Sequence, residues 1–447
     1  MAVKQKTYSM LHVLILLAIF LPMINTYLKY QGRDGEEDVT YNKPNLIGIV
    51  ISDEKPELSK STWFDGSYQF ATEDYNNDHW AYKESMVRLN NQFYYKAFNQ
   101  IRVNGFVLGK EDYVFSENYI FSAFGDDLMK EEKVKTLLQK AKVVQDTLKK
   151  KGIDLLLVYA PGKGQACKEF IEPKYNHSIK NTNHNLFANN SKDLGLNYLD
   201  LYSYFEKIKS TSPYPLFPKF GHHWSYYGEC LVVDTIIKHI EKLHHCDLPN
   251  IVWNKIEVLD TARSRDADVL KSMNLYSNPE QNMKLAYPEI QFENDSLKNT
   301  TRVLTISDSY WYGPVYMGVG QACFAYGQFW YYANRVVPSP TPGEKIEVWQ
   351  LDLKQEIESN KVIMLLYSDG NLPMFGNNFI NDAYELYTSP KTYYPRAEKN
   401  KQIQVYAKQI REAPVLLKKS TQKSNDLQIP LDSAIKIDAM KMAGLVK

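Results

Sequence analysis

Two short stretches of the chain hold residues that together could do nucleophilic chemistry. Residues 303–311 begin with an apolar run and then turn small and polar as they reach Ser309. Residues 220–228 are rich in glycine and aromatic residues and contain His223. A serine hydroxyl is a poor nucleophile until a base removes its proton, and histidine is the usual base. Ser309 and His223 are therefore the predicted nucleophile and base of an acyl-transfer reaction.

The elements expected around these residues are those of an α/β fold. Residues 303–306 form a short buried strand, and α/β folds present nucleophiles at the carboxyl ends of such strands. Ser225 is a predicted N-cap, so His223 lies just outside the N-terminus of an amphipathic helix. Apolar runs at 153–160 and 361–367 are further buried strands. The chain is therefore predicted to form a parallel sheet flanked by helices.

The remaining periodic segments support the same fold. Residues 126–151 have the clearest helical spacing of apolar residues, and the buried strand at 153–160 follows directly. The glycine-rich turn after that strand lacks the spacing of a phosphate-binding loop, so it is expected to place Lys163 near the edge of the sheet. A helix at 181–194, a strand at 197–200 and a helix at 201–210 form a second unit of the same kind.

The N-terminal region predicts a membrane anchor. Residues 10–28 form the only long apolar run and follow Lys4 and Lys6, which is typical of a signal anchor with a cytoplasmic N-terminus. A cleavable signal peptide is the alternative, although no small-residue cleavage site follows the run. Both interpretations place the rest of the protein outside the cytoplasm. Residues 29–60 are polar and charged, as expected for a tether.

Composition limits the kinds of partner and cofactor. A net charge of +1 gives no basic surface of the kind that nucleic-acid binding needs. Cys230 and Cys246 bracket one predicted helix, which separates them by about 24 Å, whereas a disulfide needs Cα atoms within about 7 Å. The adjacent residues 244–246 are His-His-Cys, but metal sites favour spaced ligands, so no metal site is predicted.

The serine and histidine stretches also resemble a known family. Asp308-Ser309 after an apolar strand is similar to the Gly-Asp-Ser block of the SGNH hydrolase superfamily, with Ser307 in place of glycine. His223-Trp224, followed by Gly228, resembles the Asp-x-His-Trp block of its alginate O-acetyltransferase branch, in which the His block precedes the Ser block, as it does here. Further similar segments lie at residues 63–66, 109–119 and 160–163, so the resemblance covers roughly residues 60–390.

The triad carboxylate is the point where the chain departs from that family. The family's aspartate, two residues before the histidine, is Gly221 here, and glycine has no side chain to orient an imidazole. Asp266 and Asp268, on a charge-dense loop between the His and Ser blocks, are the first candidates to replace it. Asp200 and Asp369 are the others, because each is expected at the carboxyl end of a strand.

The resemblance implies a function and a set of partners. It implies an O-acetyltransferase in which Ser309 carries the acetyl group, His223 serves as base and then acid, and backbone N–H groups near Ser309 stabilise the oxyanion. The acceptor would be a hydroxyl of an extracytoplasmic polysaccharide, and a membrane-bound O-acyltransferase would supply the acetyl group. No cofactor is implied. A carbohydrate esterase and an inactive polysaccharide-binding scaffold are the alternatives.

The expected organisation has four segments. Residues 1–28 are the anchor and 29–60 the tether. Residues 61–390 form the SGNH hydrolase-like domain, with an aromatic-rich segment at 318–334 that could line a substrate cleft. Residues 391–447 are a C-terminal helical appendage. The catalytic domain is accordingly expected on the periplasmic side of the cytoplasmic membrane, with a single membrane pass.

Overall fold

The structure is a computed structural model. It describes residues 56–79, 83–175, 177, 181–293, 298, 301–339 and 343–446, together with residues 10, 12, 13, 16, 20 and 46–48. The chain divides into two compact units, Met1–Leu108 with Ala267–Gln281, and Gly109–Asp266 with Asn282–Lys447. The domain boundaries expected from the sequence stay a prediction.

The predicted anchor at residues 10–28 lies almost entirely outside the described residues, as does most of the tether. Among the residues that the structure does describe, no helix is both long enough and apolar enough to cross a membrane. The anchor therefore remains an expectation from the sequence.

The first unit is helical. Its helices are α2 (Lys60–Phe64), α3 (Ser67–His79), α4 (Lys83–Phe98) and α11 (Asp268–Ser272), and it includes the short strand β1 (Phe106–Leu108). The side chain of Asn91 donates a hydrogen bond to the carbonyl of Met273 (3.0 Å), and Arg88 donates to that of Leu275 (3.0 Å). These bonds join α4 to the segment that contains α11.

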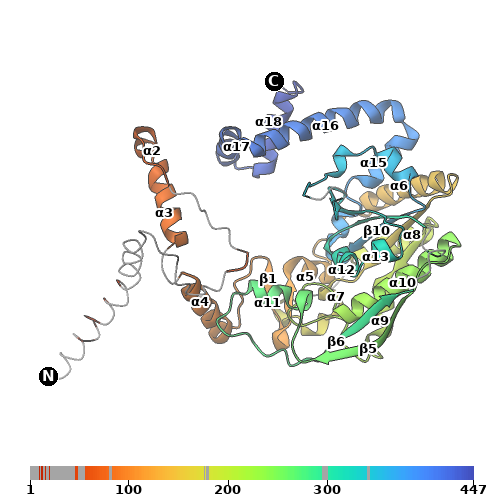
Figure 1. Cartoon of the computed structure of the whole chain (residues 1–447), viewed down its shortest axis with the longest axis horizontal. Coiled ribbons are helices and arrows are strands. Elements are labelled where there is room, and N and C mark those ends of the chain that lie inside the picture. Colours follow the sequence, from red (N-terminus) through yellow and green to blue (C-terminus); the bar gives the residue numbers. More distant parts are fainter. Residues whose placement is uncertain are drawn as a thin grey trace. The chain divides into compact units, whose positions relative to one another are not determined.

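The second unit is built around a sheet that contains β10 (Figure 1). Six strands form this sheet, in the order β4-β3-β10-β7-β8-β9. The strands are β3 (Asp154–Ala160), β4 (Tyr198–Asp200), β7 (Val303–Ser307), β8 (Phe329–Tyr331), β9 (Arg335–Val337) and β10 (Val362–Ser368). The expected parallel pairing holds from β4 to β8. The sheet is nevertheless mixed, because β9 runs antiparallel to β8. Only residues 332–334 join these two strands, which is too short for a parallel crossover.

The three central strands explain why this sheet forms. Every residue of β3, β7 and β10 is buried. Their near-continuous apolar sequences are typical of parallel strands that helices cover on both faces. The register pairs Ser307 with Leu366, and Ser368 with Ala160. The carboxyl ends of the three strands therefore meet at one edge of the sheet, where the serine block begins.

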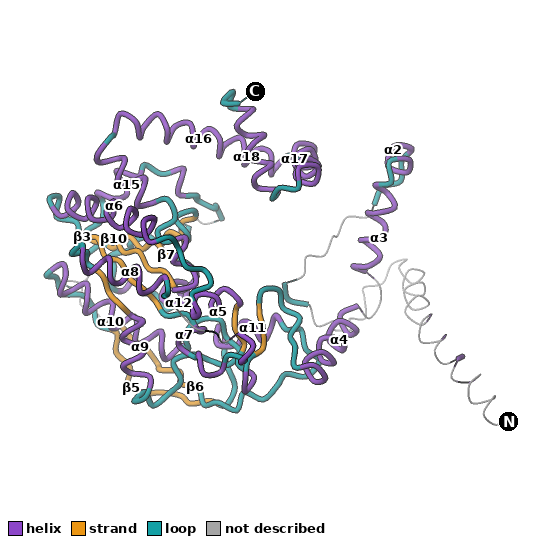
Figure 2. Tube along the Cα trace, turned by 180° about the vertical axis from the view of Figure 1, so that it is seen from behind, coloured by secondary structure: helices purple, strands orange, loops and turns teal. Residues whose placement is uncertain are grey.

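Helices cover both faces of the sheet (Figures 1 and 2). Those of one side include α6 (Glu131–Lys149) and α15 (Phe379–Thr388), which pack with α8 (Asn183–Asp193) in the main core. On the other side lie α9 (Leu201–Lys209) and α10 (Tyr226–His244). The expected apolar face of α6 is buried, as Val134, Leu138 and Leu148 show.

The strands β5 (Ile251–Leu259) and β6 (Leu285–Phe292) form a second, antiparallel sheet. This two-stranded sheet packs beside α10. The shorter elements of this unit are β2 (Val114–Ser116), α5 (Glu117–Phe124), α7 (Lys163–Ala166), α12 (Tyr312–Tyr316), α13 (Val319–Ala322) and α14 (Leu353–Glu358). The chain leaves β5 and passes through the 3₁₀ turn at Ser264–Ala267. This turn is part of the acidic loop that was expected to supply the triad carboxylate.

The C-terminal appendage is a small helical cluster. Its helices are α16 (Pro390–Glu412), α17 (Pro414–Leu427) and α18 (Leu431–Met442). Ile403, Ile410 and Ile435 belong to a separate apolar core between these helices.

Candidate active site

The nucleophile candidate lies at the carboxyl end of a central strand. The strand β7 ends at Ser307, and Ser309 opens a 3₁₀ turn at Ser309–Trp311 that continues directly into α12. Ser309 is half-buried, whereas Ser307 and Asp308 are fully buried. The structure therefore presents the hydroxyl of Ser309, rather than that of Ser307, at the edge of the sheet.

Asp308 fixes the turn that holds Ser309. One oxygen of its buried carboxylate accepts the N–H of Tyr310 (3.0 Å). The other accepts the N–H and the hydroxyl of Ser368 (2.9 and 2.7 Å) and the side-chain amide of Asn371 (2.8 Å). Because Ser368 ends β10, the carboxylate ties the serine turn to the neighbouring strand. The sequence showed the Asp-Ser pair but not this role of the aspartate.

His223 meets Ser309 across a long stretch of sequence. Its Nε2 lies 2.9 Å from the Oγ of Ser309, although the two residues are 86 positions apart. His223 precedes Ser225, whose hydroxyl accepts the N–H of Gly228 (3.1 Å) and caps α10 as expected. A base within hydrogen-bond reach of a serine hydroxyl is the geometry that proton abstraction requires.

Aromatic rings hold the imidazole of His223 from the sides. The ring of Tyr310 lies 5.0 Å from it, and that of His222 lies 4.7 Å away at a steep angle. Trp224 packs edge-on against Tyr310 (4.6 Å), and His222 stacks on Tyr119 (4.8 Å). The imidazole is buried, so these contacts restrict its orientation.

Lys163 anchors the loop that leads to His223. This lysine is buried, and its ammonium donates to the carbonyls of Lys219 (2.6 Å) and Gly221 (2.9 Å). The rings of Tyr113 and Phe115 lie 5.5 and 5.6 Å from the ammonium. The glycine-rich turn after β3 therefore serves to position the histidine block.

An ion pair between the half-buried Arg265 and the buried Glu229 supports the backbone of Ser309. Arg265 donates to the Oε1 of Glu229 (3.1 Å) and to the backbone carbonyl of Ser309 (3.2 Å). Trp224 donates to the same Oε1 (3.1 Å). Burial raises the pKa of Glu229, and the guanidinium of Arg265 opposes that rise. A Cβ at Gly313 would lie 1.4 Å from this Oε1, so only glycine allows α12 to approach the pair.

Backbone carbonyls of the acidic loop lie against Gly221, where the family pattern has an aspartate side chain. A Cβ at Gly221 would lie 2.6 Å from Pro218 Cγ and 3.0 Å from the carbonyl oxygens of Arg265 and Asp266. The acidic loop thus packs directly on Gly221. The buried carboxylate of Asp266 accepts the N–H of Tyr226 (3.1 Å), the first residue of α10, and neighbours the hydroxyl of Tyr287.

The other three carboxylate candidates have their own local contacts. Asp268 belongs to the first unit, where it opens α11 and accepts the N–H of Val269 (2.7 Å). Asp200 ends β4, as expected, and accepts a hydrogen bond from His184 (2.9 Å) as well as from the backbone and hydroxyl of Ser203.

Asp369 follows β10, as expected, and is buried. Its carboxylate accepts the N–H of Gly370 (2.7 Å) and that of Gly162. Burial raises the pKa of Asp369 from its ordinary value of 3.8 to about 7. This carboxyl group therefore titrates close to neutral pH.

Tyrosines gather beside the nucleophile. The ring of Tyr312 lies 6.2 Å from that of Tyr316 and 5.0 Å from that of Tyr331. Arg335 donates to the hydroxyl of Tyr312 (2.7 Å), and Tyr331 pairs with Ser307 in the sheet register. We call Tyr312, Tyr316 and Tyr331 the tyrosine platform. Of the aromatic segment expected to line a cleft, Phe324, Phe329 and Trp330 are instead buried in the core.

Cysteines and metal ligands add no further chemistry to this site. All four cysteines are free, in agreement with the exclusion of a Cys230–Cys246 disulfide. Within the described ranges, no three His, Cys, Asp or Glu side chains gather closely enough to hold a metal ion.

Comparison with known proteins supports the sequence resemblance. Residues 106–279 match the family model described as an SGNH hydrolase-like domain, acetyltransferase AlgX. The chain is similar to the SGNH hydrolase-like acetyltransferases. The matched segment contains His223, Asp266 and Asp268 but ends before Ser309. The resemblance predicted from the histidine and serine blocks is confirmed, and it supports an enzyme that acts on acyl groups. A search of curated protein sequences found no match.

Solved structures are also similar over most of their length. They include the O-acetyltransferase domain of Pseudomonas putida AlgJ, with 18% identity and a TM-score of 0.41, covering 63% of this chain and 99% of that one. Bacillus cereus PatB1 has 15% identity and a TM-score of 0.36, covering 59% and 96%. Pseudomonas aeruginosa AlgX has 13% identity and a TM-score of 0.39, covering 62% and 67%. At these TM-scores the site's own geometry carries the functional inference.

The raised pKa of Asp369 predicts a pH-dependent stability. Between pH 4 and 7 the folded state keeps this proton while the unfolded state has lost it, so the free energy of unfolding falls as the pH rises. Each pKa unit corresponds to about 1.4 kcal/mol, so wild type should lose up to about 4 kcal/mol relative to Asp369→Asn over this range. Urea unfolding of both proteins from pH 4 to 8 measures the difference.

The amide oxygen that Asp369→Asn introduces can still accept the two backbone N–H groups, so the variant should fold. Asp146→Asn on the exposed surface of α6 is the matched control and should follow the wild-type profile. A constant difference between wild type and Asp369→Asn across the range would contradict the assignment.

Proposed function

We propose that the chain is an O-acetyltransferase that moves an acetyl group, through an acyl-enzyme on Ser309, onto hydroxyls of an extracytoplasmic polysaccharide. The observation that carries this proposal is the 2.9 Å separation between Ser309 Oγ and His223 Nε2. The match of residues 106–279 to an acetyltransferase family supports the reaction class.

In the first half-reaction, His223 takes the proton of Ser309 as the serine oxygen attacks the acetyl carbonyl carbon. The bond from that carbon to the donor's oxygen breaks, and His223 gives its proton to the departing oxygen. In the second half-reaction, a sugar hydroxyl gives its proton to His223 and attacks the acyl carbon. The bond to Ser309 Oγ then breaks, and Ser309 regains the proton from His223.

The start of a helical segment supports stabilisation of the oxyanion. Ser309 is the first residue of the helical stretch 309–316, and the first N–H groups of a helix have no partner within it. Asp308 already binds the N–H of Tyr310, so the N–H of Ser309 is the proposed donor. Arg265 holds the carbonyl of Ser309 and thereby fixes the peptide that follows.

The tyrosine platform supports a sugar acceptor rather than water. Tyr316 is largely exposed, and Tyr312 and Tyr331 are half-buried, so ring surface is available beside the serine turn. A tyrosine offers an apolar ring face together with a polar hydroxyl, which suits the mixed surface of a sugar ring. An acceptor bound there would compete with water for the acyl-enzyme.

The resemblance and the N-terminal sequence support a proposal for the partner and the location. We propose that a membrane-bound O-acyltransferase supplies the acetyl group to Ser309 on the periplasmic side of the cytoplasmic membrane. The apolar run at 10–28, preceded by Lys4 and Lys6, supports an anchor that would keep the enzyme beside such a donor.

The acyl-enzyme gives the first test of this mechanism. An aryl acetyl ester or a serine-directed sulfonyl probe should label Ser309, and Ser309→Ala should abolish labelling, as read by mass spectrometry of the intact protein and its peptides. His223→Ala should slow labelling by about two orders of magnitude or more, because general-base assistance is then lost. Ser307→Ala, in which the neighbouring buried hydroxyl is removed, is the matched control and should label normally.

Labelling that persists in Ser309→Ala, or that appears on Ser307, would sink the assignment of the nucleophile. Acetate release in the presence of polysaccharide, with no acetylated sugar formed, would instead show a carbohydrate esterase. A chain that never labels but binds polysaccharide would be a scaffold.

A second test concerns the triad carboxylate, for which Asp266 and Asp268 remain the first candidates. In serine proteases, loss of the triad aspartate costs about 10⁴ in rate. Asp266→Asn or Asp268→Asn should therefore lower acyl transfer by orders of magnitude, whereas Asp200→Asn and Asp369→Asn should lower it far less. Single-turnover acetylation by an aryl acetate, with circular dichroism to confirm folding, measures this.

Gly221→Asp adds a structural control to that series. Because a Cβ at position 221 meets Pro218 and two backbone carbonyls, adding the family's aspartate should not restore activity to an inactive Asp266 or Asp268 variant. Full activity in all four Asn variants would show that His223 works without a carboxylate or is not the base.

The anchor predicts a topology that can be measured separately. The intact protein should fractionate with membranes, and protease added to spheroplasts should remove the domain that contains Ser309, since Lys4 and Lys6 keep the N-terminus cytoplasmic. A cytoplasmic protein cleaved only after lysis is the control. Release of a soluble domain that has lost residues 1–28 would favour the signal-peptide alternative.

A further inference from the structure

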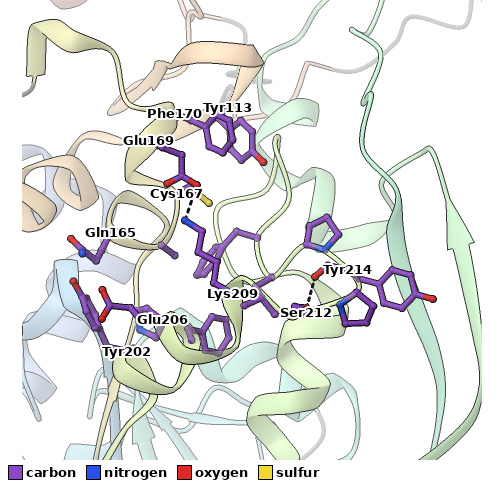
Figure 3. Close-up of a pocket in the computed structure, with 17 residues that line it drawn as sticks. Tyr113, Gln165, Cys167, Glu169, Phe170, Tyr202, Glu206, Lys209, Ser212 and Tyr214 are labelled. Atoms are coloured by element: carbon purple, nitrogen blue, oxygen red, sulfur yellow. Dashed lines mark hydrogen bonds and ion pairs between the residues drawn. The ribbon is translucent and has the colours of Figure 1, made fainter.

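A cavity of about 690 Å³ opens in the second unit between α7, α9 and the segment 212–217 (Figure 3). This volume lies within the range of small-molecule binding pockets. Neither Ser309 nor His223 is among the residues that line it. The cavity is therefore a separate feature that the proposed chemistry does not use.

The walls of the cavity are fixed by contacts of their own. Tyr113 and Phe170 stack face to face, with ring centroids 3.9 Å apart. The opposite wall, the segment 212–217, is tied to the N-cap of α10, because Ser225 donates its hydroxyl to the carbonyl of Pro215 (2.6 Å) and its N–H to that of Leu216 (2.8 Å). The cavity is therefore preformed. Its wall at 212–217 is hydrogen-bonded to Ser225, two residues after His223.

The lining combines rings with polar groups. Phe170, Tyr202 and Tyr214 are half-buried and line the cavity with part of their surface. Gln165 and Glu206 add an amide and an exposed carboxylate, and Figure 3 shows both on the side of Tyr202. Amide and carboxylate oxygens accept hydrogen bonds from hydroxyl groups. Ring faces and acceptors together suit a ring-shaped ligand that carries several hydroxyls.

The charge of the lining selects against anions. Its charged residues are Glu169, Glu206 and Lys209, two carboxylates and one ammonium. Lys209 is already paired with Glu169 (2.7 Å), as the dashed line in Figure 3 shows. Glu206 therefore remains as the excess charge, and a carboxylate or phosphate placed beside it would be repelled.

We propose that this cavity binds a neutral sugar residue of a polysaccharide, at a distinct subsite from the one that presents a hydroxyl to Ser309. The identity of this polysaccharide as the acetyl acceptor rests on the function proposed above. A polymer held at both places would be anchored at two points of the second unit. Loss of the subsite should therefore weaken binding of polymer while leaving the chemistry at Ser309 intact.

The test uses the full-length protein and defined oligosaccharides. Isothermal titration calorimetry is run with the neutral β1,4-linked tetramers of glucose, mannose, xylose and N-acetylglucosamine, and with an anionic tetragalacturonate. At least one neutral tetramer should bind, and tetragalacturonate should bind at least tenfold more weakly. The double variant Gln165→Ala/Glu206→Ala should weaken binding of that neutral tetramer at least tenfold. Lys207→Ala, the next residue of α9 and absent from the lining, should bind as wild type does.

Labelling of Ser309 by a small acetyl ester separates this proposal from the proposed function. Wild type and the double variant should label at the same rate, because the cavity does not contain the nucleophile. Failure of labelling with sugar binding intact would overturn the acyl transfer and leave the subsite standing. The subsite is overturned if none of the neutral tetramers binds, if the double variant binds them unchanged, or if tetragalacturonate binds as tightly.

Discussion

The hydrogen bond between Ser309 and His223 depends on two loops that the sheet alone does not hold together. Ser309 follows β7, whereas His223 precedes a helix on one face of the sheet, so each loop needs its own support. On the serine side, Asp308 bonds to the end of β10 and Arg265 holds the carbonyl of Ser309. On the histidine side, the ammonium of Lys163 holds the approaching backbone. Each support is a charged group next to one of the two reacting residues. Asp308 and Lys163 are buried, and Arg265 is half-buried.

Buried charged groups contribute little to the stability of a fold. Their presence beside Ser309 and His223 therefore calls for another explanation. Removing an ion from water costs several kcal/mol, and an apolar replacement of similar size often stabilises a protein more. Glu229 and Lys163 are nevertheless buried beside the site, and Glu229 is paired with the half-buried Arg265. These groups fix the orientation of the backbone, since a charged donor holds the position of a carbonyl more firmly than apolar packing does. We infer that these groups serve the geometry of the site more than the stability of the fold.

The sequence predicts the centre of the fold better than its edges. The strands β3, β7 and β10 are continuous apolar runs with both faces covered, a pattern that few structures besides a buried parallel strand produce. The strands β8 and β9 have three residues each, so their sequences carry too little periodicity to be recognised. In the ribbon of β5 and β6, exposed and buried residues do not alternate regularly, and a shift in register interrupts the pairing. The helix α17 is mostly exposed, and Ser420 is the one residue of this helix that is buried.

For the candidate site, residue type and local context were enough to select Ser309 and His223, but not their supports. A strand that ends in a serine and a histidine before an N-cap are local patterns. The approach of Arg265 to Ser309 arises only after the chain has passed through α10 and β5, so no spacing in the sequence reveals it. Gly313 is the one feature of the sequence that reflects this contact, because the Arg265–Glu229 pair occupies the position that the Cβ of any other residue would take. A single glycine at the start of a helix is too common a feature to indicate such a contact from sequence alone.

Gly221, which stands where the family pattern has an aspartate, packs directly against the acidic loop that contains Arg265 and Asp266. The carbonyls of Arg265 and Asp266 lie 3.0 Å from the position of a Cβ at residue 221, closer than a side chain there would allow without displacement. A side chain at position 221 would therefore require Pro218 and the two loop carbonyls to shift. With glycine at 221, the loop can come close enough for Asp266 to bind the first N–H of α10 and for Arg265 to reach Ser309. The loop that packs on Gly221, just before the histidine, thus carries both a candidate acid, Asp266, and the arginine that holds the carbonyl of Ser309.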